Sequence, residues 1–340
     1  MSTTEAAEPI AAAEQETINY AHAINAALAE EMRRDDRVWI MGQDVGRMGG
    51  VFGVTRGLCD EFGSARVRDT TINETFIVGG AAGAAIAGTI PVVELQFADF
   101  LLTAGDEVFH KLAKWRYVHG GHFTLPVVVR APTGVLGGAG AEHSQSLEAI
   151  CMHVPGLKVA LPATPADAKG LLKTAIRDPN PVIFFEHKGL YRVKGEVPSD
   201  PEFLVPFGQA AVRRHGDALT VVATGLMVSR ALEAAERLSA DGLEVEVIDP
   251  RTLVPLDMET ILASVQRTGR ALIVHEAVRT AGAGAEIAAR IQEEAFFALD
   301  APVWRLGAID APIPQDPNLE QLCIPQTETI LTAMRELTAL

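Results

Sequence analysis

Glu74 is the first of four side chains whose type and place in the sequence suggest chemistry. It is a lone carboxylate at the start of a run of apolar and small residues, and Phe76 to Val93 carries no charge. Such a carboxylate either caps the first amide groups of its own helix or is held, with a raised pKa, for work on a ligand. The residues alone leave both interpretations open.

Gln96, Phe100 and His143 are the other three candidates. Gln96 and Phe100 are expected at the carboxyl end of a strand, where ligands bind in open α/β sheets. They offer a hydrogen-bond donor and a ring that can stack. His143 lies in a Gly-rich loop, where a histidine is a better candidate for function than on an apolar helix face. The competing interpretations are that Phe100 is core, that Gln96 is an ordinary loop amide, and that Ser144 or Ser146 caps a helix.

The elements that must position these side chains alternate between strand and helix. Short apolar segments typical of buried strands recur at 38–41, 67–72, 91–97, 126–131, 157–161 and 182–186, and again at 219–223, 245–248, 271–275 and 303–306. Helical periodicity between most of them indicates parallel sheets covered by helices on both faces. Prolines and scattered charges interrupt the pattern from Gly189 to Pro206. We therefore expect two α/β domains, 17–190 and 206–340, a linker over 191–205 and a flexible arm over 1–16.

Length and charge limit the classes of function. The 340 residues are ample for two domains. A net charge of −15 argues against binding to nucleic acid or to an anionic membrane surface. Cys59, Cys151 and Cys323 have neither metal-site nor disulfide-framework spacing. The first 16 residues lack the order of charge and hydrophobicity of a signal peptide. We therefore expect a cytoplasmic protein.

Seven motifs, in order along the chain, resemble those of one protein family. They are Asp69-Thr-Thr-Ile-Asn-Glu74, Glu94-Leu-Gln-Phe-Ala-Asp-Phe100, Glu142-His-Ser-Gln-Ser146, Pro155-Gly-Leu-Lys-Val159, Asp167-Ala-Lys-Gly-Leu-Leu172, Ala175-Ile-Arg-Asp-Pro-Asn-Pro181 and the segment Val245 to Asp257. The chain resembles the β subunit of the thiamine-diphosphate-dependent decarboxylating component of 2-oxo acid dehydrogenase complexes. Family members serve pyruvate, branched-chain 2-oxo acids or acetoin. The resemblance implies a pyrimidine-binding domain followed by a transketolase C-terminal-like domain.

The same resemblance implies a role for each candidate side chain. In the family, the glutamate that matches Glu74 hydrogen-bonds a ring nitrogen of the aminopyrimidine and thereby helps to remove the proton from the thiazolium carbon. By position, Phe100 packs on the aminopyrimidine, Gln96 lines the site, and His143 helps to pass the acyl group to a lipoyl arm. Main-chain groups of five residues also match a potassium site, for which a structural turn is the alternative: Val127, Ala175, Ile176, Asp178 and Asn180.

The partners follow from a motif that the sequence lacks. It contains no Gly-Asp-Gly signature for a metal bound to a diphosphate. The resemblance therefore implies an α subunit that holds the diphosphate of thiamine diphosphate and its Mg²⁺. It also implies an α2β2 heterotetramer that acts on a small 2-oxo acid and delivers the acyl group to the lipoyl domain of a dihydrolipoyl acyltransferase core.

Three alternative functions and one departure from the family remain. The alternatives are an acetoin-cleaving β subunit, a single-chain transketolase relative such as deoxyxylulose-phosphate synthase, and a non-catalytic scaffold subunit of the same fold. The departure is Gln43, where many family members have glutamate. An amide there cannot share a proton as a carboxylate can, so the change removes one acidic group from any proton path between paired active sites.

Overall fold

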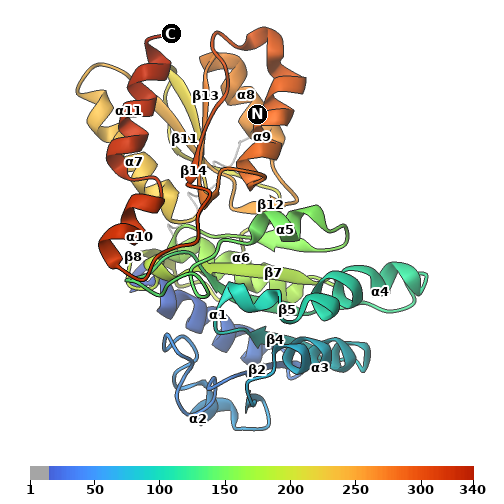
Figure 1. Cartoon of the computed structure of the whole chain (residues 1–340). Coiled ribbons are helices and arrows are strands. Elements are labelled where there is room, and N and C mark those ends of the chain that lie inside the picture. Colours follow the sequence, from blue (N-terminus) through green and yellow to red (C-terminus); the bar gives the residue numbers. More distant parts are fainter. Residues whose placement is uncertain (1–14) are drawn as a thin grey trace, which may run out of the picture.

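The chain folds into two α/β domains that lie one above the other in Figure 1. This computed structural model describes residues 15–340. The first domain is built on a seven-stranded sheet and the second on a five-stranded sheet. The predicted fold class, two α/β domains in this order, is therefore confirmed. No helix among the described residues is both apolar and long enough to cross a membrane.

The first domain carries its sheet in the strand order β12-β6-β7-β5-β4-β2-β3. All of its strands are parallel except β12, which lies antiparallel to β6. Its elements are α1 (Tyr20–Arg34), β2 (Val38–Gly42), α2 (Leu58–Phe62), β3 (Val67–Asp69), α3 (Glu74–Ile86), β4 (Ile90–Glu94), η1 (Ala98–Leu101), η2 (Glu107–Leu112), α4 (Ala113–Val118), β5 (Val128–Thr133), α5 (Glu148–His153), β6 (Lys158–Ala160), α6 (Pro165–Arg177), β7 (Val182–His187) and η3 (Lys188–Leu190).

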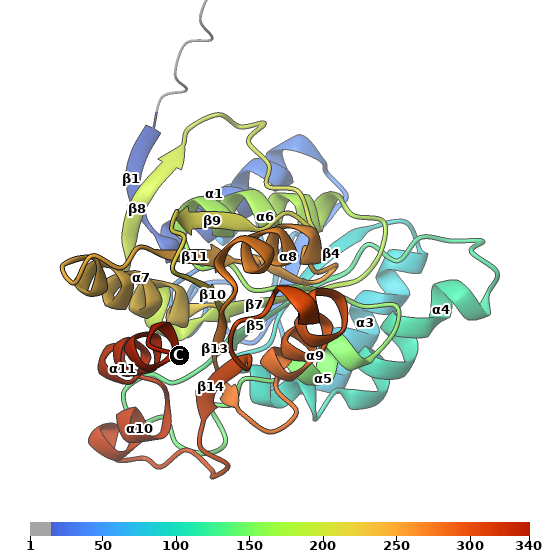
Figure 2. The ribbon, with the colours of Figure 1, turned by 90° about the horizontal axis from the view of Figure 1, so that it is seen from above.

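Apolar layers cover this sheet on both faces, as the continuous apolar strands predict. Helices α3 and α5 pack on one face and α1 and α6 on the other, which Figure 2 shows from above. Strand residues alternate between the two layers: Val93 and Val129 belong to the α3 side, and Val92 and Val128 to the α1 side. Because both faces are covered, the ends of the strands are where side chains can meet a ligand.

The second domain has the strand order β14-β13-β10-β11-β9, with β9 antiparallel to β11. Its elements are β9 (Ala211–Arg214), β10 (Leu219–Ala223), α7 (Leu226–Ser239), β11 (Val245–Asp249), α8 (Met258–Thr268), β13 (Ala271–Val278), α9 (Ala283–Ala295), η4 (Phe296–Ala298), β14 (Trp304–Ala308), α10 (Pro317–Cys323) and α11 (Thr327–Thr338). Helices α7 and α11 cover one face of this sheet, and α8 and α9 the other.

The two domains share structure at their junction. Strand β12 (Thr252–Val254), from the second half of the chain, adds to the edge of the first sheet beside β6. The Arg213 guanidinium contacts the carboxylates of both Asp167 and Asp249, so it bridges α6 of the first domain and β11 of the second. The domains are therefore joined by main-chain hydrogen bonds between β12 and β6 and by the ion pairs of Arg213.

The segment predicted as a linker is not all loop. It contains β8 (Lys194–Pro198), which pairs antiparallel with β1 (Gln15–Asn19). Gln15 and Glu16, which we predicted to belong to a flexible arm, are part of this strand pair, so that prediction is wrong for these two residues. Residues 1–14 of the predicted arm lie outside the described residues.

Candidate active site

The predicted site residues follow neighbouring strands of the first sheet. Glu74 follows β3, Gln96 and Phe100 follow β4, and His143 follows β5. These strands are parallel, so their carboxyl ends, and the loops that follow them, lie on the same side of the sheet, which we call its carboxyl-terminal edge. Gln43, half-buried behind β2, lies at the same edge. The topology thus places all four candidates where an open α/β sheet binds ligands.

Glu74 does not cap its helix. The N-cap of α3 is Asn73, whose Oδ1 accepts a hydrogen bond of 2.9 Å from the Phe76 amide. Glu74 is the first helical residue and is half-buried. Thr75 ties this first turn to the segment behind Phe100, because its hydroxyl donates to the Thr103 carbonyl at 3.3 Å. Helix capping is therefore removed as an explanation for the Glu74 carboxylate.

Aromatic rings bring Phe100 and His143 together. The His143 imidazole lies edge-on to Phe97, with ring centroids 4.4 Å apart, and to Phe100 at 5.6 Å. All three side chains are half-buried, so Phe100 is not a core residue. Helix α5 begins at Glu148 without a side-chain cap, so neither Ser144 nor Ser146 caps it. Phe97 was missed from the sequence, although its place in the same motif as Phe100 could have indicated it.

A buried charge network supports the strands beneath these loops. Arg130, on β5, is fully buried; its guanidinium donates to Glu186 at 2.6 and 2.9 Å and to Glu94 at 2.5 Å. The Tyr191 hydroxyl also donates to Glu186, at 2.8 Å. Burial raises the pKa of Glu94, while the charge of Arg130 opposes that rise. These residues join the ends of β4, β5 and β7, which carry the loops of the candidate site.

Acidic side chains of the second domain hold the loop that leads to His143. Glu276 accepts a hydrogen bond of 2.6 Å from the Val135 amide. Glu320 accepts hydrogen bonds from the amides of Gly137 and Gly138, at 3.0 and 2.8 Å. A side chain at Gly138 would meet the main chain of the second domain, since a Cβ there would lie 2.2 Å from the Gln315 carbonyl oxygen. The loop is therefore fixed between the two domains.

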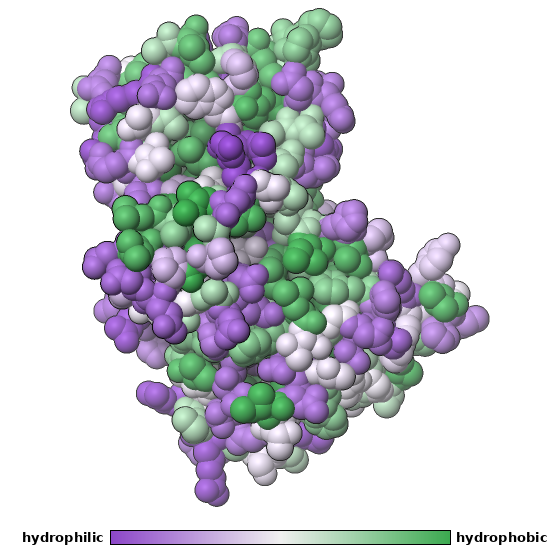
Figure 3. Space-filling model, in the orientation of Figure 1, coloured by the Kyte–Doolittle hydropathy of each residue, from purple (hydrophilic) through white to green (hydrophobic). Residues whose placement is uncertain are grey.

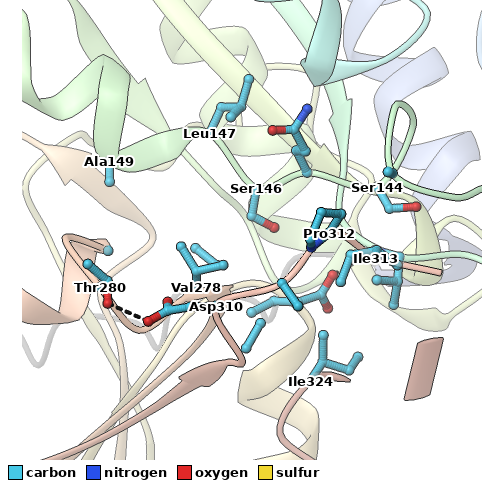
Figure 4. A pocket seen from close by; sticks show the side chains of 18 of the residues that line it. Ser144, Ser146, Leu147, Ala149, Val278, Thr280, Asp310, Pro312, Ile313 and Ile324 are labelled. Atoms are coloured by element: carbon cyan, nitrogen blue, oxygen red, sulfur yellow. Dashed lines mark hydrogen bonds between the residues drawn. The ribbon is translucent and has the colours of Figure 1, made fainter. Parts of the chain in front are cut away.

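A cavity of about 870 Å³ lies beside this loop at the domain junction (Figure 4). Its walls include Ser144, Val278, Ile313 and Ile324, and a hydrogen bond of 2.7 Å from Thr280 to Asp310 crosses one side of it. Glu74, Phe100 and His143 are not among its lining residues. These three candidate side chains therefore do not line the cavity, although Ser144, next to His143 in the sequence, is part of its wall.

Glu148 is a buried carboxyl near the same junction. Burial raises its pKa to about 7; the negative charge of Glu276 adds to this rise, whereas its own backbone amide and the charge of His187 oppose it. His187 and Glu276 are themselves both buried and joined at 2.7 Å across the domain boundary. At neutral pH a large fraction of Glu148 therefore still holds its proton in the folded protein.

Glu148→Gln is expected to reduce the pH dependence of stability. The folded pKa of about 7 exceeds the ordinary 4.5. The contribution of this proton is therefore fully present below pH 4.5 and is lost as pH rises through 7. The loss amounts to about 3 kcal/mol. When urea unfolding is measured from pH 4.5 to 8, the free energy of unfolding of the variant should rise relative to that of the wild type as pH increases. The exposed Glu142→Gln is the control; a Glu148→Gln curve parallel to the wild type would contradict the assignment.

The five residues predicted to bind potassium lie close together. Ala175 and Ile176 are in the last turn of α6, Asp178 is its C-cap, and Asn180 follows. The Val127 carbonyl accepts a hydrogen bond of 2.9 Å from the Val182 amide just beyond them. The Lys158 ammonium pairs with the Asp178 carboxylate, and Arg116 donates to the Asn180 side chain. A carbonyl oxygen that already accepts one hydrogen bond can still bind an ion, so the potassium site stays a prediction. The cationic side chains of Lys158 and Arg116 at the same place favour the alternative, a structural turn.

Comparisons with known proteins agree with this arrangement. Residues 16–194 match the family described as transketolase, pyrimidine binding domain, and residues 208–330 match transketolase, C-terminal domain. A split-gene transketolase, described as an inactive β4 tetramer, has the same fold, with a TM-score of 0.75 at 24% identity over 95% of this chain and 99% of its own.

Three curated relatives are more similar in sequence. The 2-oxoisovalerate dehydrogenase subunit β of Bacillus subtilis is 47% identical over 94% of this chain and 98% of its own. An acetoin:2,6-dichlorophenolindophenol oxidoreductase subunit β of Cupriavidus necator is 45% identical over 92% and 95%. A pyruvate dehydrogenase β subunit of Rhizobium meliloti is 42% identical over 96% and 71%. The chain therefore belongs to the family of β subunits of 2-oxo acid dehydrogenases and acetoin dehydrogenases.

Proposed function

We propose that the chain is the β half of a thiamine-diphosphate-dependent enzyme that decarboxylates a 2-oxo acid and transfers the acyl group to a lipoyl domain. The observation that carries the proposal is Glu74, a half-buried carboxylate at the ligand-binding edge of the sheet whose helix is already capped by Asn73. A half-buried carboxylate that is not the helix cap, at the end of the sheet where ligands bind in open α/β folds, is a candidate for work on a ligand.

The side chains at this edge fit an aminopyrimidine. Glu74 offers a carboxyl group to a ring nitrogen, Phe100 offers a half-buried ring for stacking, and Gln96 offers an amide. When bound, thiamine diphosphate would supply the nucleophilic carbon and the electron sink that decarboxylation of a 2-oxo acid needs. Glu74 holds or returns the proton at the pyrimidine nitrogen. His143, which packs against Phe97 and Phe100, would supply a nitrogen for hydrogen bonding as the acyl group passes to the lipoyl sulfur.

An α subunit completes the site in this proposal. The curated relatives are named as β subunits, and this sequence contains no Gly-Asp-Gly signature for a metal-bound diphosphate. The α subunit therefore holds the diphosphate and Mg²⁺, and two copies of each chain form an α2β2 heterotetramer. The acyl group leaves on the lipoyl domain of a dihydrolipoyl acyltransferase core.

Sequence identity does not distinguish the substrate, because relatives with different substrates are almost equally similar to this chain. An assay is needed to identify it. The 2-oxoisovalerate and acetoin relatives differ by two percentage points in identity, so acetoin cleavage is the second candidate. The test is to reconstitute the chain with its α subunit and to offer pyruvate, 2-oxoisovalerate and acetoin. Decarboxylation of a 2-oxo acid by the pair, absent from either chain alone, supports the proposal. Turnover of acetoin alone supports the second candidate, and no turnover with any substrate supports a scaffold subunit.

Helix α3 is the proposed contact with another subunit of this assembly. Phe76, Gly83 and Ile86 lie on one exposed face of it; Phe76 is 55% and Ile86 43% exposed. Ile72, just before the helix, is 73% exposed. Among the described residues, and apart from the neighbouring backbone of α3 itself, no atom lies within 4 Å of the place where a side chain at Gly83 would begin. An apolar stripe with a gap at its centre admits a neighbouring helix closely.

Gly83→Leu is expected to block assembly without harming the isolated chain. The free space at Gly83 accepts a side chain, and leucine favours a helix over glycine by about 0.5–1 kcal/mol. In the heterotetramer the same side chain overpacks the contact at a cost of about 1–3 kcal/mol or more. Analytical ultracentrifugation measures the assembly, and Gly83→Ala, with a single methyl group, is the matched control. A Gly83→Leu heterotetramer as stable as the wild type would show that this face is not a subunit contact.

A further inference from the structure

Lys188 is a buried lysine for which neither the resemblance nor the comparisons suggest a role. It begins η3, directly behind β7, and is only 2% exposed. Its ammonium donates to the main-chain carbonyl of His143 and lies 5.0 Å from the centroid of the Phe97 ring. Burying an ammonium group is costly unless it is well paired. Among residues 15–340, no carboxylate forms an ion pair with Lys188, so its burial calls for another explanation.

The two contacts of Lys188 converge on His143. One holds the His143 main chain, and the other lies on the ring against which the His143 imidazole packs edge-on at 4.4 Å. Hydrogen bonds from a charged donor are about twice as strong as those between neutral groups. Lys188 therefore restrains both the backbone and the side-chain support of the same histidine.

The residue two positions further on is held independently of Lys188. Asp99 accepts hydrogen bonds from the Gln145 amide at 3.2 Å and from its side chain at 2.9 Å, and the Thr133 hydroxyl donates to the Gln145 carbonyl at 3.0 Å. Before His143, the loop is fixed by Glu276 and Glu320, as described above. The His143 amide itself donates to the Gly140 carbonyl at 3.3 Å. Lys188 is thus the side-chain anchor at His143 itself.

We propose that Lys188 is a positioning residue that fixes His143 for transfer of the acyl group to the lipoyl arm. The inference rests on the proposed function for the identity of the transfer step. Burial lowers the pKa of Lys188 to about 8, and the charges of Asp99, Glu276 and Glu320 oppose the fall. The amine is therefore still largely charged at pH 7, in the state that donates most strongly to the carbonyl of His143.

The first test needs no activity. Hydrogen–deuterium exchange of the peptide that covers residues 140–147 is compared in the full-length wild type, Lys188→Met, Lys188→Arg and the exposed control Lys194→Met. Losing a charged hydrogen bond should speed exchange in this peptide by about tenfold or more in Lys188→Met. Lys188→Arg should recover part of the protection, and Lys194→Met should match the wild type. Wild-type protection in Lys188→Met would overturn the proposal.

The second test separates transfer from decarboxylation in the reconstituted α–β complex. Misplacing a catalytic group by about 1 Å can cost about 100-fold in rate. Lys188→Met should therefore lower acylation of a free lipoyl domain by about 10- to 100-fold. Decarboxylation measured with an artificial electron acceptor should change by less than about threefold, and Lys188→Arg should restore part of the transfer. Equal losses in both reactions, or none, would contradict positioning. A wild type without any decarboxylation refutes the proposed function instead, and the exchange measurement then still decides what Lys188 holds.

Discussion

Arg130→Met is expected to lower the free energy of unfolding by about 3–5 kcal/mol, the usual cost of breaking a buried ion pair by removing one partner. The substitution keeps an unbranched apolar stem but removes the guanidinium, so Glu94 and Glu186 stay buried without their cation. Both are carboxylates with side chains that are 4% and 0% exposed, so water cannot replace the lost partner. The ends of β4, β5 and β7 should loosen together, and with them the loops of the site.

The control for this substitution is a surface arginine with the same kind of partner. Arg33 forms an ion pair of 2.6 Å with Glu61, but the two side chains are 56% and 42% exposed. Arg33→Met should cost less than about 1 kcal/mol. Urea unfolding of both variants measures the difference. If Arg130→Met were no more destabilising than Arg33→Met, the buried network would not support the sheet. Adding Glu94→Gln and Glu186→Gln to Arg130→Met should recover part of the loss, because no unpaired charge then remains.

Glu74→Gln is expected to lower decarboxylation by the reconstituted complex by about 100- to 10,000-fold, the usual contribution of a positioned general acid or base. Glutamine keeps the shape of the side chain and can still form a hydrogen bond, but it cannot hold or return a proton. The effect belongs to the chemical step, so the affinity for the cofactor, whose diphosphate is held by the α subunit in our proposal, should change far less.

Stability distinguishes this role from a structural one. Asn73, not Glu74, caps α3, so Glu74→Gln should change the free energy of unfolding by no more than about 0.5 kcal/mol. Asn73→Ala, one position away, should cost about 1 kcal/mol because it removes the cap. A Glu74→Gln protein that is clearly destabilised but turns over at the wild-type rate would assign the carboxylate to the fold.

Local signals were sufficient to predict most of the architecture. The apolar strands and intervening periodic helices gave both α/β domains, because such segments must be buried between helical layers. The candidate residues could be placed at one edge because parallel strands present their carboxyl ends together. The position of α3 was indicated by the long apolar run after Glu74, but the residues alone offered Glu74 as its cap, which in the structure is Asn73.

Pairings between distant segments could not be read in the same way. The edge strand β12 is three residues long and pairs with β6, more than 90 positions earlier. Likewise β8 pairs with β1, about 180 positions away, and turns part of a predicted linker into sheet. Segments as short as these have no periodicity of their own. Their structure is set by the partner strand, which the local sequence does not specify.

The supporting charges were missed, although the sequence held a signal for them. Arg130 and Glu186 each end a run of strongly apolar strand residues, and Glu94 ends a third. Charges at the ends of buried strands are rarely tolerated alone, so three of them on neighbouring strands could have been predicted to pair. Lys188 had a weaker signal. Its partner is a main-chain carbonyl in another loop, and no residue type in the sequence marks such an acceptor.

The most direct test of the account follows the proton that Glu74 is proposed to control. In the reconstituted α–β complex loaded with thiamine diphosphate, hydrogen–deuterium exchange at the thiazolium carbon is measured by rapid quench and NMR, for the wild type and for Glu74→Gln. The account expects fast exchange in the wild-type complex and exchange at least about 100-fold slower in the variant. Equal exchange rates in the two complexes would show that Glu74 does not activate the cofactor.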